Sequence, residues 1–451
     1  MPNEKSFDVE NAGVKKPETN KSQSRPKRLA VLASGGPAPG INSVISAVTI
    51  EAINRGWEVL GVKDGYRGLV DDDMKQLSRE DVDWIHFRGG AVLGMSRTSP
   101  VQGDNLEKIV ATIKRRGIDF LVTIGGDGTA FGASFIAAET GGVLRCAHVP
   151  KTIDNDLPLP EGVPSFGYTT ACHVGVGMVQ NLIIDAQTTR RWHLVTTMGR
   201  QAGHLAIGIG KASGAHLTLI PEEFGIDGAT VDKFVSIIEG AVIKGRAEGR
   251  HWGLAVIGEG LVGALKASEL EKLPDAGRDS FGNIRLANVA LGTILCDQVT
   301  RRLAERGIDV AMREIKLGYE LRCADPVPFD IEYTRDLGYG AVRFLADGGT
   351  NAIVVVDHKK RTYVPFEHMR DPKTGRPRVR NVDINSENYH VARRYMQRLG
   401  RRDFADPQQL ARLAAAANTT PEAFKSEFER LVCGEPMDFD GPGEKRELKL
   451  N

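Results

Sequence analysis

Two short acidic stretches combine residue types that handle phosphate groups, and the first is "TIGGDGTA" at residues 123–130. Three glycines surround Asp127 there, directly after the apolar "FLV". Glycine lets a backbone come close to a ligand, and a carboxylate beside a phosphate needs a divalent cation between them. The stretch therefore predicts a loop in which Asp127 holds Mg²⁺ against a phosphate. The alternative is a structural turn in which Asp127 caps the following helix.

The second stretch, "VPKTIDNDLPLP" at residues 149–160, places two carboxylates two positions apart. Of Asp154 and Asp156, one can accept a proton from a hydroxyl nucleophile while the other orients it or holds metal-bound water. Lys151 adds a cation nearby. This pattern favours phosphoryl transfer to a hydroxyl group. A solvated turn rich in Asp and Asn is the alternative.

Further polar residues follow or flank apolar runs. The glycines of "SGGPAPGIN", residues 34–42, can expose backbone N–H groups at a helix start and so form an anion cradle. Glu259 can accept hydrogen bonds from sugar hydroxyls, and His204 is either a ligand contact or structural. A lone arginine is usually a surface charge, but several at strand ends favour bidentate phosphate clamps. The arginines in such places are Arg97, Arg190, Arg191, Arg200 and Arg322.

Apolar runs typical of strands alternate with helical patterns along the chain, which predicts an α/β protein with mainly parallel sheets. In such sheets, ligands bind beyond the carboxyl ends of the strands. We expect strands at residues 28–33, 57–62, 119–124, 145–150, 193–197, 216–220 and 254–260. We expect helices at residues 41–56, 104–118, 130–140, 169–189 and 287–307, and Ala-rich helices from about residue 400.

The strand–helix pattern restarts after Phe166, which predicts two Rossmann-like three-layer lobes with a cleft between them. Residues 1–27 are polar, without the apolar core of a secretory signal, and are expected to form a disordered arm. The expected divisions are a large donor-binding lobe at 28–168 plus about 330–380, a small sugar-phosphate lobe at 169–329, a helical extension at about 381–433 and a tail at 434–451.

Composition excludes several functional classes. The net charge is +1, so no global basic field favours nucleic acid, and no apolar run is long enough to predict a membrane span. The five cysteines are scattered and odd in number, which argues against a disulfide framework or a zinc site. A reducing cytoplasm is the expected compartment.

Taken in order, the residues resemble the phosphofructokinase family over about residues 28–400. Single motifs are weak, but the ordered set is specific, above all "PKTIDND" followed by "MGR". The series reads "SGGPAPGIN", "DGYRGL", "LGMSR", "IGGDGT", "PKTIDND", "MGRQAGH", "GEG" and "LGYELR".

The resemblance implies transfer of a phosphoryl group to the 1-hydroxyl of fructose 6-phosphate. It implies Asp154 as the base, with Lys151 and Arg200 also catalytic, and Asp127 as the Mg²⁺ ligand. Arg191 resembles the family arginine that reaches into a neighbouring subunit's site, which implies a homodimer or homotetramer. The implied sugar-phosphate contacts are Thr152, Ile153, Asp154, Arg191, Met198, Gly199, Arg200, Glu259, Tyr319 and Arg322. The implied donor contacts are Gly36, Arg97, Gly126, Asp127, Gly128 and Thr129.

The phosphoryl donor is either ATP or pyrophosphate, and the sequence places ATP first. The pyrophosphate enzymes that this chain resembles commonly carry a second Asp at the position of Gly128, together with a Lys at the position of Lys151. That second Asp would repel the α-phosphate of ATP. Here the lysine is kept but the second acid is absent, so ATP can enter. The length of the chain and the "LGYELR" stretch instead resemble the pyrophosphate branch.

Two rival functions are weaker. An NAD or lipid kinase would share "GGDGT" alone, and the other motifs argue against it. A non-catalytic regulatory subunit of the same fold would be expected to lack Asp127, Asp154 or the arginines, all of which this chain keeps.

Overall fold

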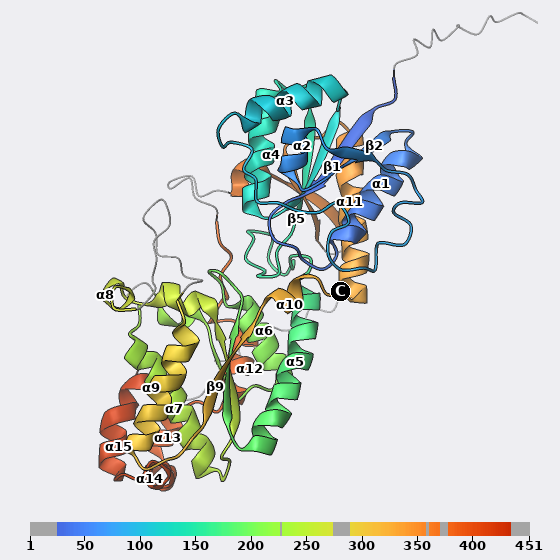
Figure 1. Cartoon of the computed structure of the whole chain (residues 1–451). Helices are drawn as coiled ribbons and strands as arrows, with labels where there is room; N and C mark the ends of the chain where they lie inside the picture. The colour runs from blue at the N-terminus through green and yellow to red at the C-terminus, as the bar shows by residue number, and fades with distance from the viewer. Residues whose placement is uncertain (1–24, 226–227, 274–288, 358–359, 370–377, 434–451) are drawn as a thin grey trace, which may run out of the picture.

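The computed structural model describes residues 25–225, 228–273, 289–357, 360–369 and 378–433. Two sheets organise these residues into two lobes (Figure 1). The predicted arm at 1–27 and tail at 434–451 lie almost wholly outside the described residues. The predicted α/β class, with two lobes built on mainly parallel sheets, is confirmed. The assignment of one lobe to the donor and the other to the sugar phosphate stays a prediction.

The first sheet has seven strands in the order β11-β10-β5-β4-β1-β2-β3. Its five central strands are parallel, and β3 and β11 pair antiparallel at the edges. The strands are β1 (Arg28–Ala33), β2 (Glu58–Val62), β3 (Met74–Gln76), β4 (Phe120–Gly125), β5 (Arg145–Pro150), β10 (Ala352–Asp357) and β11 (Lys360–Pro365).

Helices cover both faces of this sheet because successive strand residues point to opposite sides. Leu29 and Val31 of β1 pack with helices α1 and α11, while Ala30 and Leu32 pack with α2, α3 and α4. The bounds are α1 (Ile41–Asn54), α2 (Tyr66–Asp71), α3 (Asn105–Arg116), α4 (Asp127–Glu139) and α11 (Pro328–Ala346), with a short turn η4 (Phe366–Met369).

The second sheet has four parallel strands in the order β7-β8-β6-β9. They are β6 (Trp192–Thr197), β7 (Leu217–Leu219), β8 (Gly253–Gly258) and β9 (Met312–Leu317). The surrounding helices are α5 (Tyr168–Thr189), α6 (His204–Ser213), α7 (Val231–Ala247), α8 (Ala267–Leu270), α9 (Leu291–Glu305) and α10 (Tyr319–Arg322), with turns η1 (Pro221–Phe224) and η2 (Glu259–Ala264).

The C-terminal helices share the core of the second lobe. Phe424 and Phe428 are fully buried in the same apolar cluster as the strands of that sheet. Arg306 of α9 bonds to the buried Glu239 of α7 at 2.7 Å and also pairs with Glu427 of α15. The elements are α12 (Glu387–Tyr395), α13 (Arg401–Ala405), α14 (Pro407–Ala416), α15 (Pro421–Phe428) and η5 (Glu429–Val432).

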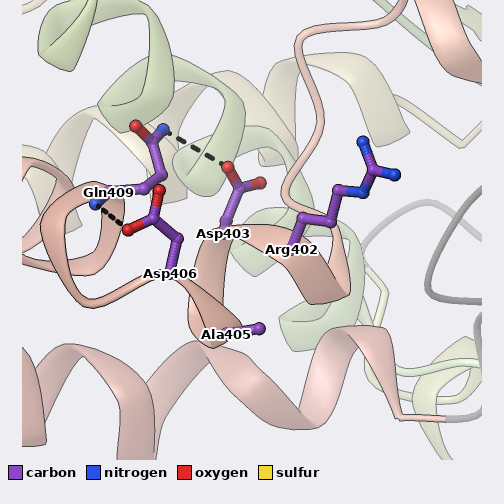
Figure 2. A pocket seen from close by; sticks show the side chains of 5 residues that line it. All are labelled: Arg402, Asp403, Ala405, Asp406 and Gln409. Atoms are coloured by element: carbon purple, nitrogen blue, oxygen red, sulfur yellow. Dashed lines mark hydrogen bonds between the residues drawn. The ribbon is translucent and has the colours of Figure 1, made fainter.

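A surface hollow lies between α13 and α14, and its polar groups bond to one another (Figure 2). The amide of Gln409 donates to Asp403 at 3.3 Å, and the carboxylate of Asp406 accepts from the backbone of Gln409 at 3.4 Å. None of its lining residues is a predicted site residue. They are Arg402, Asp403, Ala405, Asp406 and Gln409.

The sequence expectations hold best for the buried strands. The predicted ranges 28–33 and 145–150 coincide with β1 and β5. The helix expected from residue 130 begins at Asp127 instead, because the glycine stretch itself forms the first helical turn. Strand β3, strands β10 and β11 and helices α7 and α11 were not predicted.

One buried carboxylate joins two of the places where the chain passes between the lobes. Asp330, in the first turn of α11, has no exposed surface. It accepts hydrogen bonds from the backbone of Gly167 at 2.9 Å and of Thr170 at 2.8 Å, and from the Thr170 hydroxyl. Gly167 is the N-cap of α5 and has no side chain of its own to bond there. Asp330 therefore caps α5 from another element.

We predict that Asp330→Ala lowers the free energy of unfolding by roughly 2–4 kcal/mol, because it leaves three buried donors without an acceptor. Denaturant unfolding followed by circular dichroism measures the change. Asp336→Ala, at an exposed position on the same helix, is the control and should change stability by less than about 0.5 kcal/mol. Equal effects of the two substitutions would contradict this role for Asp330.

Candidate active site

Loops at the carboxyl ends of three neighbouring strands of the first sheet come together. The chain leaves β1 at Ser34, β4 at Gly126 and β5 at Lys151. The Lys151 ammonium group is buried and donates to the carbonyl of Gly36 at 2.5 Å. The backbone N–H of Lys151 also donates to Gly125 at 2.8 Å. Lys151 thus connects all three loops.

The glycine stretch after β4 forms the N-terminus of α4. Gly126 is the N-cap, and Asp127 is exposed in the first turn, where its Oδ1 accepts from the backbone of Gly128 at 2.8 Å. Asp127 is therefore not the N-cap residue, although its carboxylate satisfies one backbone N–H of the first turn of α4. Free N–H groups and the helix dipole favour an anion at such an end. The buried Thr129 hydroxyl lies 3.4 Å from the carbonyl of Ser34 and fixes the loop to β1.

The loop after β5 carries the predicted base. Asp154 is partly buried, and burial, with the nearby carboxylates of Asp156 and Glu259, raises its pKa to about 7. The backbone N–H of Asp154 donates to the Thr152 hydroxyl at 3.0 Å. Asn155 has a positive φ of 56°, so the chain turns sharply between the two acidic residues. The solvated turn considered as an alternative does not fit, since burial is the main cause of this shift.

Two cations balance these acids. Burial lowers the pKa of Lys151 to about 8, and Arg322 acts in the same direction, whereas Asp154 opposes the shift. Arg322 belongs to the second lobe, but its guanidinium lies 3.7 Å from the position that a Cβ on Gly36 would occupy. The guanidinium also lies over the Tyr319 ring, at 5.0 Å from its centroid. The site therefore lies where the two lobes meet.

The predicted sugar-side residues gather at the carboxyl ends of β6, β8 and β9. Oε1 of Glu259 accepts from the backbone of Gly199 at 3.3 Å, and burial raises the pKa of this carboxyl group. The Met198 side chain packs against Gly318, where a Cβ would lie only 2.6 Å from it. Arg200 and Tyr319 are exposed beside them.

The loop after β5 itself reaches into the second lobe. Ile153 is buried in the apolar cluster of that lobe, although the strand before it belongs to the first sheet. Thr152 is partly buried next to it. Ile153 therefore contacts the second lobe directly before Asp154, and the predicted contacts of Thr152 and Ile153 with a sugar stay predictions.

One predicted residue is not brought to this place. Arg191 lies directly before β6, at the opposite end of the strand from Met198, and its Nε is buried without a hydrogen-bond partner. Its predicted role in a neighbouring subunit stays a prediction. Arg97 is exposed, but it follows Ser96, whose carbonyl accepts from the backbone N–H of Gly35 at 3.0 Å, so it lies beside the loop after β1. Its predicted contact with the donor stays a prediction. Nε2 of His204 donates to the carbonyl of Arg380 at 2.9 Å, which favours the structural role for this histidine.

The sequence analysis missed Arg380. Its guanidinium donates to the carbonyl of Asn155 at 3.0 and 3.1 Å, between the two acidic residues of the base loop. No motif marks Arg380, which is far from the loop in sequence. The only signal in the sequence is that Arg380 is a charged residue that follows the apolar Val379, in "RVRNV".

The acidic residues fit the requirements of Mg²⁺. The charge of Asp127 contributes to raising the pKa of Asp156, after the larger effect of burial, so the two carboxylates act on each other electrostatically. Mg²⁺ takes one or two carboxylates and completes its shell with phosphate oxygens and water. Within the described ranges no group of three or more His, Cys, Asp and Glu side chains is placed to hold a metal ion.

Comparisons with known proteins agree on one family. The family model described as "Phosphofructokinase" matches residues 28–345. A "Pyrophosphate--fructose 6-phosphate 1-phosphotransferase" from Thermotoga maritima is 50% identical over 89% of this chain and 98% of its own length. A protein of the same name from Naegleria fowleri is 45% identical over 90% of this chain and 95% of its own length. An "ATP-dependent 6-phosphofructokinase" from Corynebacterium efficiens is 34% identical over 75% of this chain and 92% of its own length.

Solved structures share the fold. The phosphofructokinase of Saccharomyces cerevisiae superposes with a TM-score of 0.64 at 24% identity, over 76% of this chain and 44% of the yeast chain. The pyrophosphate-dependent phosphofructokinase of Marinobacter aquaeolei has a TM-score of 0.63 at 17% identity, over 82% of this chain and 91% of its own. Among the helices that the structure describes, none is both long and apolar enough to cross a membrane.

We predict that Asp154→Asn stabilises the ligand-free protein at pH 8 by about 2–4 kcal/mol. The folded-state pKa of about 7 lies above the unfolded value of 3.8, so stability is lost as the pH rises from about 4 to 7, and the loss is complete above pH 7. The difference should therefore be clearly smaller at pH 5 than at pH 8, because only part of the loss is present at pH 5. Urea unfolding at both pH values, without phosphate ligands or divalent cations, measures it.

Asp127→Asn is the matched control for this experiment, because Asp127 is exposed and its substitution removes a carboxylate from the same site. It should change stability little at either pH. If Asp154→Asn shifted stability equally at pH 5 and pH 8, burial would not be holding the carboxyl group near neutrality.

Proposed function

The chain belongs to the phosphofructokinase family, and on that premise we propose that it transfers a phosphoryl group from pyrophosphate to the 1-hydroxyl of fructose 6-phosphate. It is a phosphotransferase with an alcohol acceptor. The observation that carries the proposed chemistry is the environment of Asp154, a carboxyl group between the lobes whose pKa of about 7 suits a general base at neutral pH.

The side chains around Asp154 have complementary roles in this reaction. Asp154 accepts the proton of the attacking 1-hydroxyl. Lys151 and Arg322 both lie next to Gly36 and would supply positive charge for the phosphoryl group as negative charge spreads over its oxygens. The N-terminus of α4, whose helix dipole favours an anion, would lie against the donor, with Gly126, Gly128 and Thr129 lining it. Transfer is direct, since no nucleophile and base are paired here.

Mg²⁺ fits this site as a bound cofactor. Asp127, together with Asp156, would hold the cation, which when bound neutralises charge on the phosphate oxygens. The protein itself positions these two carboxylates and leaves Asp154 available to the acceptor hydroxyl.

The acceptor would lie against the second lobe. Arg200 and Arg322 provide charge for its 6-phosphate, and Glu259 can accept from a sugar hydroxyl while holding the backbone of Gly199. A second copy of the chain would add Arg191 to this site, which supports a homo-oligomer with shared sites. With five free cysteines among its residues, the enzyme fits a reducing cytoplasm.

Two observations favour pyrophosphate as the donor. The relatives named for pyrophosphate match at 50% and 45% identity over nearly their whole length, whereas the relative named for ATP matches at 34% over three quarters of this chain. The Lys151 ammonium also lies at the junction of the three donor-side loops, where it can bind a short diphosphate. The sequence alone had placed ATP first, and the relatives favour the alternative that it left open.

ATP remains the second candidate because of Gly128. No atom lies within 4 Å of the Cβ position at this glycine, so the place beyond the first turn of α4 is open. Neither bulk nor a negative charge there opposes an α-phosphate and its nucleoside.

Asp154→Asn tests the reaction itself. Without the base, turnover should fall by at least about a thousandfold, while fructose 6-phosphate still binds. Isothermal titration with fructose 6-phosphate and a coupled assay for the bisphosphate product measure the two effects. Residual activity above a few per cent of the parent enzyme would exclude Asp154 as the base.

We predict that pyrophosphate supports turnover with a kcat/KM at least about tenfold above that of ATP at fixed Mg²⁺. Initial rates with each donor at saturating fructose 6-phosphate decide this. Turnover with ATP alone would refute the proposed donor and leave the family reaction intact.

Gly128→Asp examines the open position directly. If ATP reaches the site through this space, the new carboxylate should depress ATP use by at least about tenfold more than pyrophosphate use, because it repels the α-phosphate. Gly177→Asp, on α5 where no atom lies within 4 Å of the Cβ position, is a control for the added charge. Equal losses with both donors would show that Gly128 does not govern the choice.

A further inference from the structure

Arg380 holds the loop that carries the proposed base. It lies beyond β11 and η4, and no part of the motif series includes it. Its Nε and one terminal nitrogen donate to the Asn155 carbonyl at 3.1 and 3.0 Å, and the same nitrogen donates to Oδ1 of Asn155. The other terminal nitrogen donates to the carbonyl of Val163 at 2.6 Å. One guanidinium therefore joins the beginning and the end of the base loop.

The residue that Arg380 holds is the conformational pivot of that loop. Asn155 separates Asp154 from Asp156 and adopts a left-handed conformation with a φ of 56°. Its Oδ1 also accepts from the backbone of Ser165 at 2.9 Å. Asn155 is held at its backbone carbonyl and at its side-chain amide oxygen. A residue fixed at both points sets the directions in which the two flanking carboxylates point. Arg380 thus acts on the acids through Asn155.

The backbone of Arg380 ties the same loop to the second lobe. Its N–H donates to the carbonyl of Asp156 at 2.8 Å, and its carbonyl accepts from Nε2 of His204 at 2.9 Å. His204 begins α6 directly after the predicted sugar loop "MGRQAG". Two residues later, the N–H of Val382 donates to Glu222 at 2.9 Å, and Glu222 also accepts from Gly203. The segment therefore contacts the base loop and the sugar loop together.

These bonds are made where burial strengthens them. Arg380 is partly buried, and burial lowers the pKa of its guanidinium while Asp156 opposes that shift. A buried cation that fills its donors with backbone oxygens fixes geometry better than an exposed one. Its planar fork matches two acceptors of one residue, which a lysine ammonium cannot reproduce.

We propose that Arg380 is a positioning residue for the phosphoryl transfer, which sets the geometry of Asp154 through Asn155 and holds the base loop against the sugar loop. This rests on the proposed function, in which Asp154 is the base. Arg380 touches neither the acceptor nor the donor in this role. Its loss should therefore act on the rate of the chemical step more than on the binding of either substrate.

The test is steady-state kinetics of Arg380→Gln with fructose 6-phosphate and pyrophosphate. We expect kcat to fall roughly 30- to 100-fold, as for a misplaced catalytic group, with each KM changed less than about threefold. Arg380→Lys keeps the cation but not the two-point fork, so its kcat should also fall at least about tenfold. Arg378→Gln is the matched control on the same segment, because Arg378 is exposed, and it should keep the parent kcat.

A double-mutant cycle with Asn155→Gly separates positioning from general support of the fold. Glycine tolerates the positive φ and removes Oδ1. The fold-loss of kcat in the double variant should be clearly smaller than the product of the two single losses, because both substitutions remove the bond between Arg380 and Oδ1 of Asn155. Thermal unfolding of each variant confirms that the protein measured is folded.

Three results would overturn the proposal. The first is a parent-like kcat in Arg380→Gln, or in Arg380→Lys if the glutamine variant does not fold. The second is a variant in which KM rises and kcat does not fall. The third is a double variant whose loss of kcat equals the product of the two single losses. Asp154→Asn run in parallel keeps the two proposals apart. An inactive Asp154→Asn beside an active Arg380→Gln refutes only the role of Arg380, whereas an active Asp154→Asn refutes the base assignment.

Discussion

The carboxyl group of Asp154 is buried where the two lobes meet, next to two other carboxyl groups, and the rest of the site is arranged around that fact. A buried carboxylate is unfavourable unless cations and donors compensate it. Lys151 from the first lobe and Arg322 from the second provide that charge. The compensation is incomplete, and this is what keeps the pKa of Asp154 near the pH at which a base is useful.

The two lobes have to be held in register for this balance to exist. Asp330 fixes the start of α5 to the start of α11, at two of the places where the chain passes between the lobes. Ile153 extends the loop after β5 into the apolar core of the second lobe. Arg380 adds a third tie, from the C-terminal side, to the same loop and to His204. In all three contacts, groups that do not take part in the reaction position the groups that do.

Much of this arrangement follows from local sequence. The strands β1, β4 and β5 are short apolar runs of a length and content that only a buried strand explains, and the glycine and acidic stretches directly follow them. Because parallel strands bring their carboxyl ends to one edge, the meeting of Gly36, Asp127 and Lys151 could be predicted without the structure. The edge strand β11 could not, since it is largely exposed and carries little periodic signal. The start of α4 was misplaced because glycines obscure a helical turn.

The sequence by itself determined the chemistry at hand: the order of the motifs, the acids and the cations, and the family to which they belong. Tertiary structure decided which of those groups act on one another. It placed Arg191 at the far end of β6 from Met198 and made His204 a partner of the C-terminal segment. It also brought Arg380 to Asn155 across 225 positions of the chain. The physical reason is that local patterns encode burial and turns, whereas a charge finds its partner only after the lobes have packed.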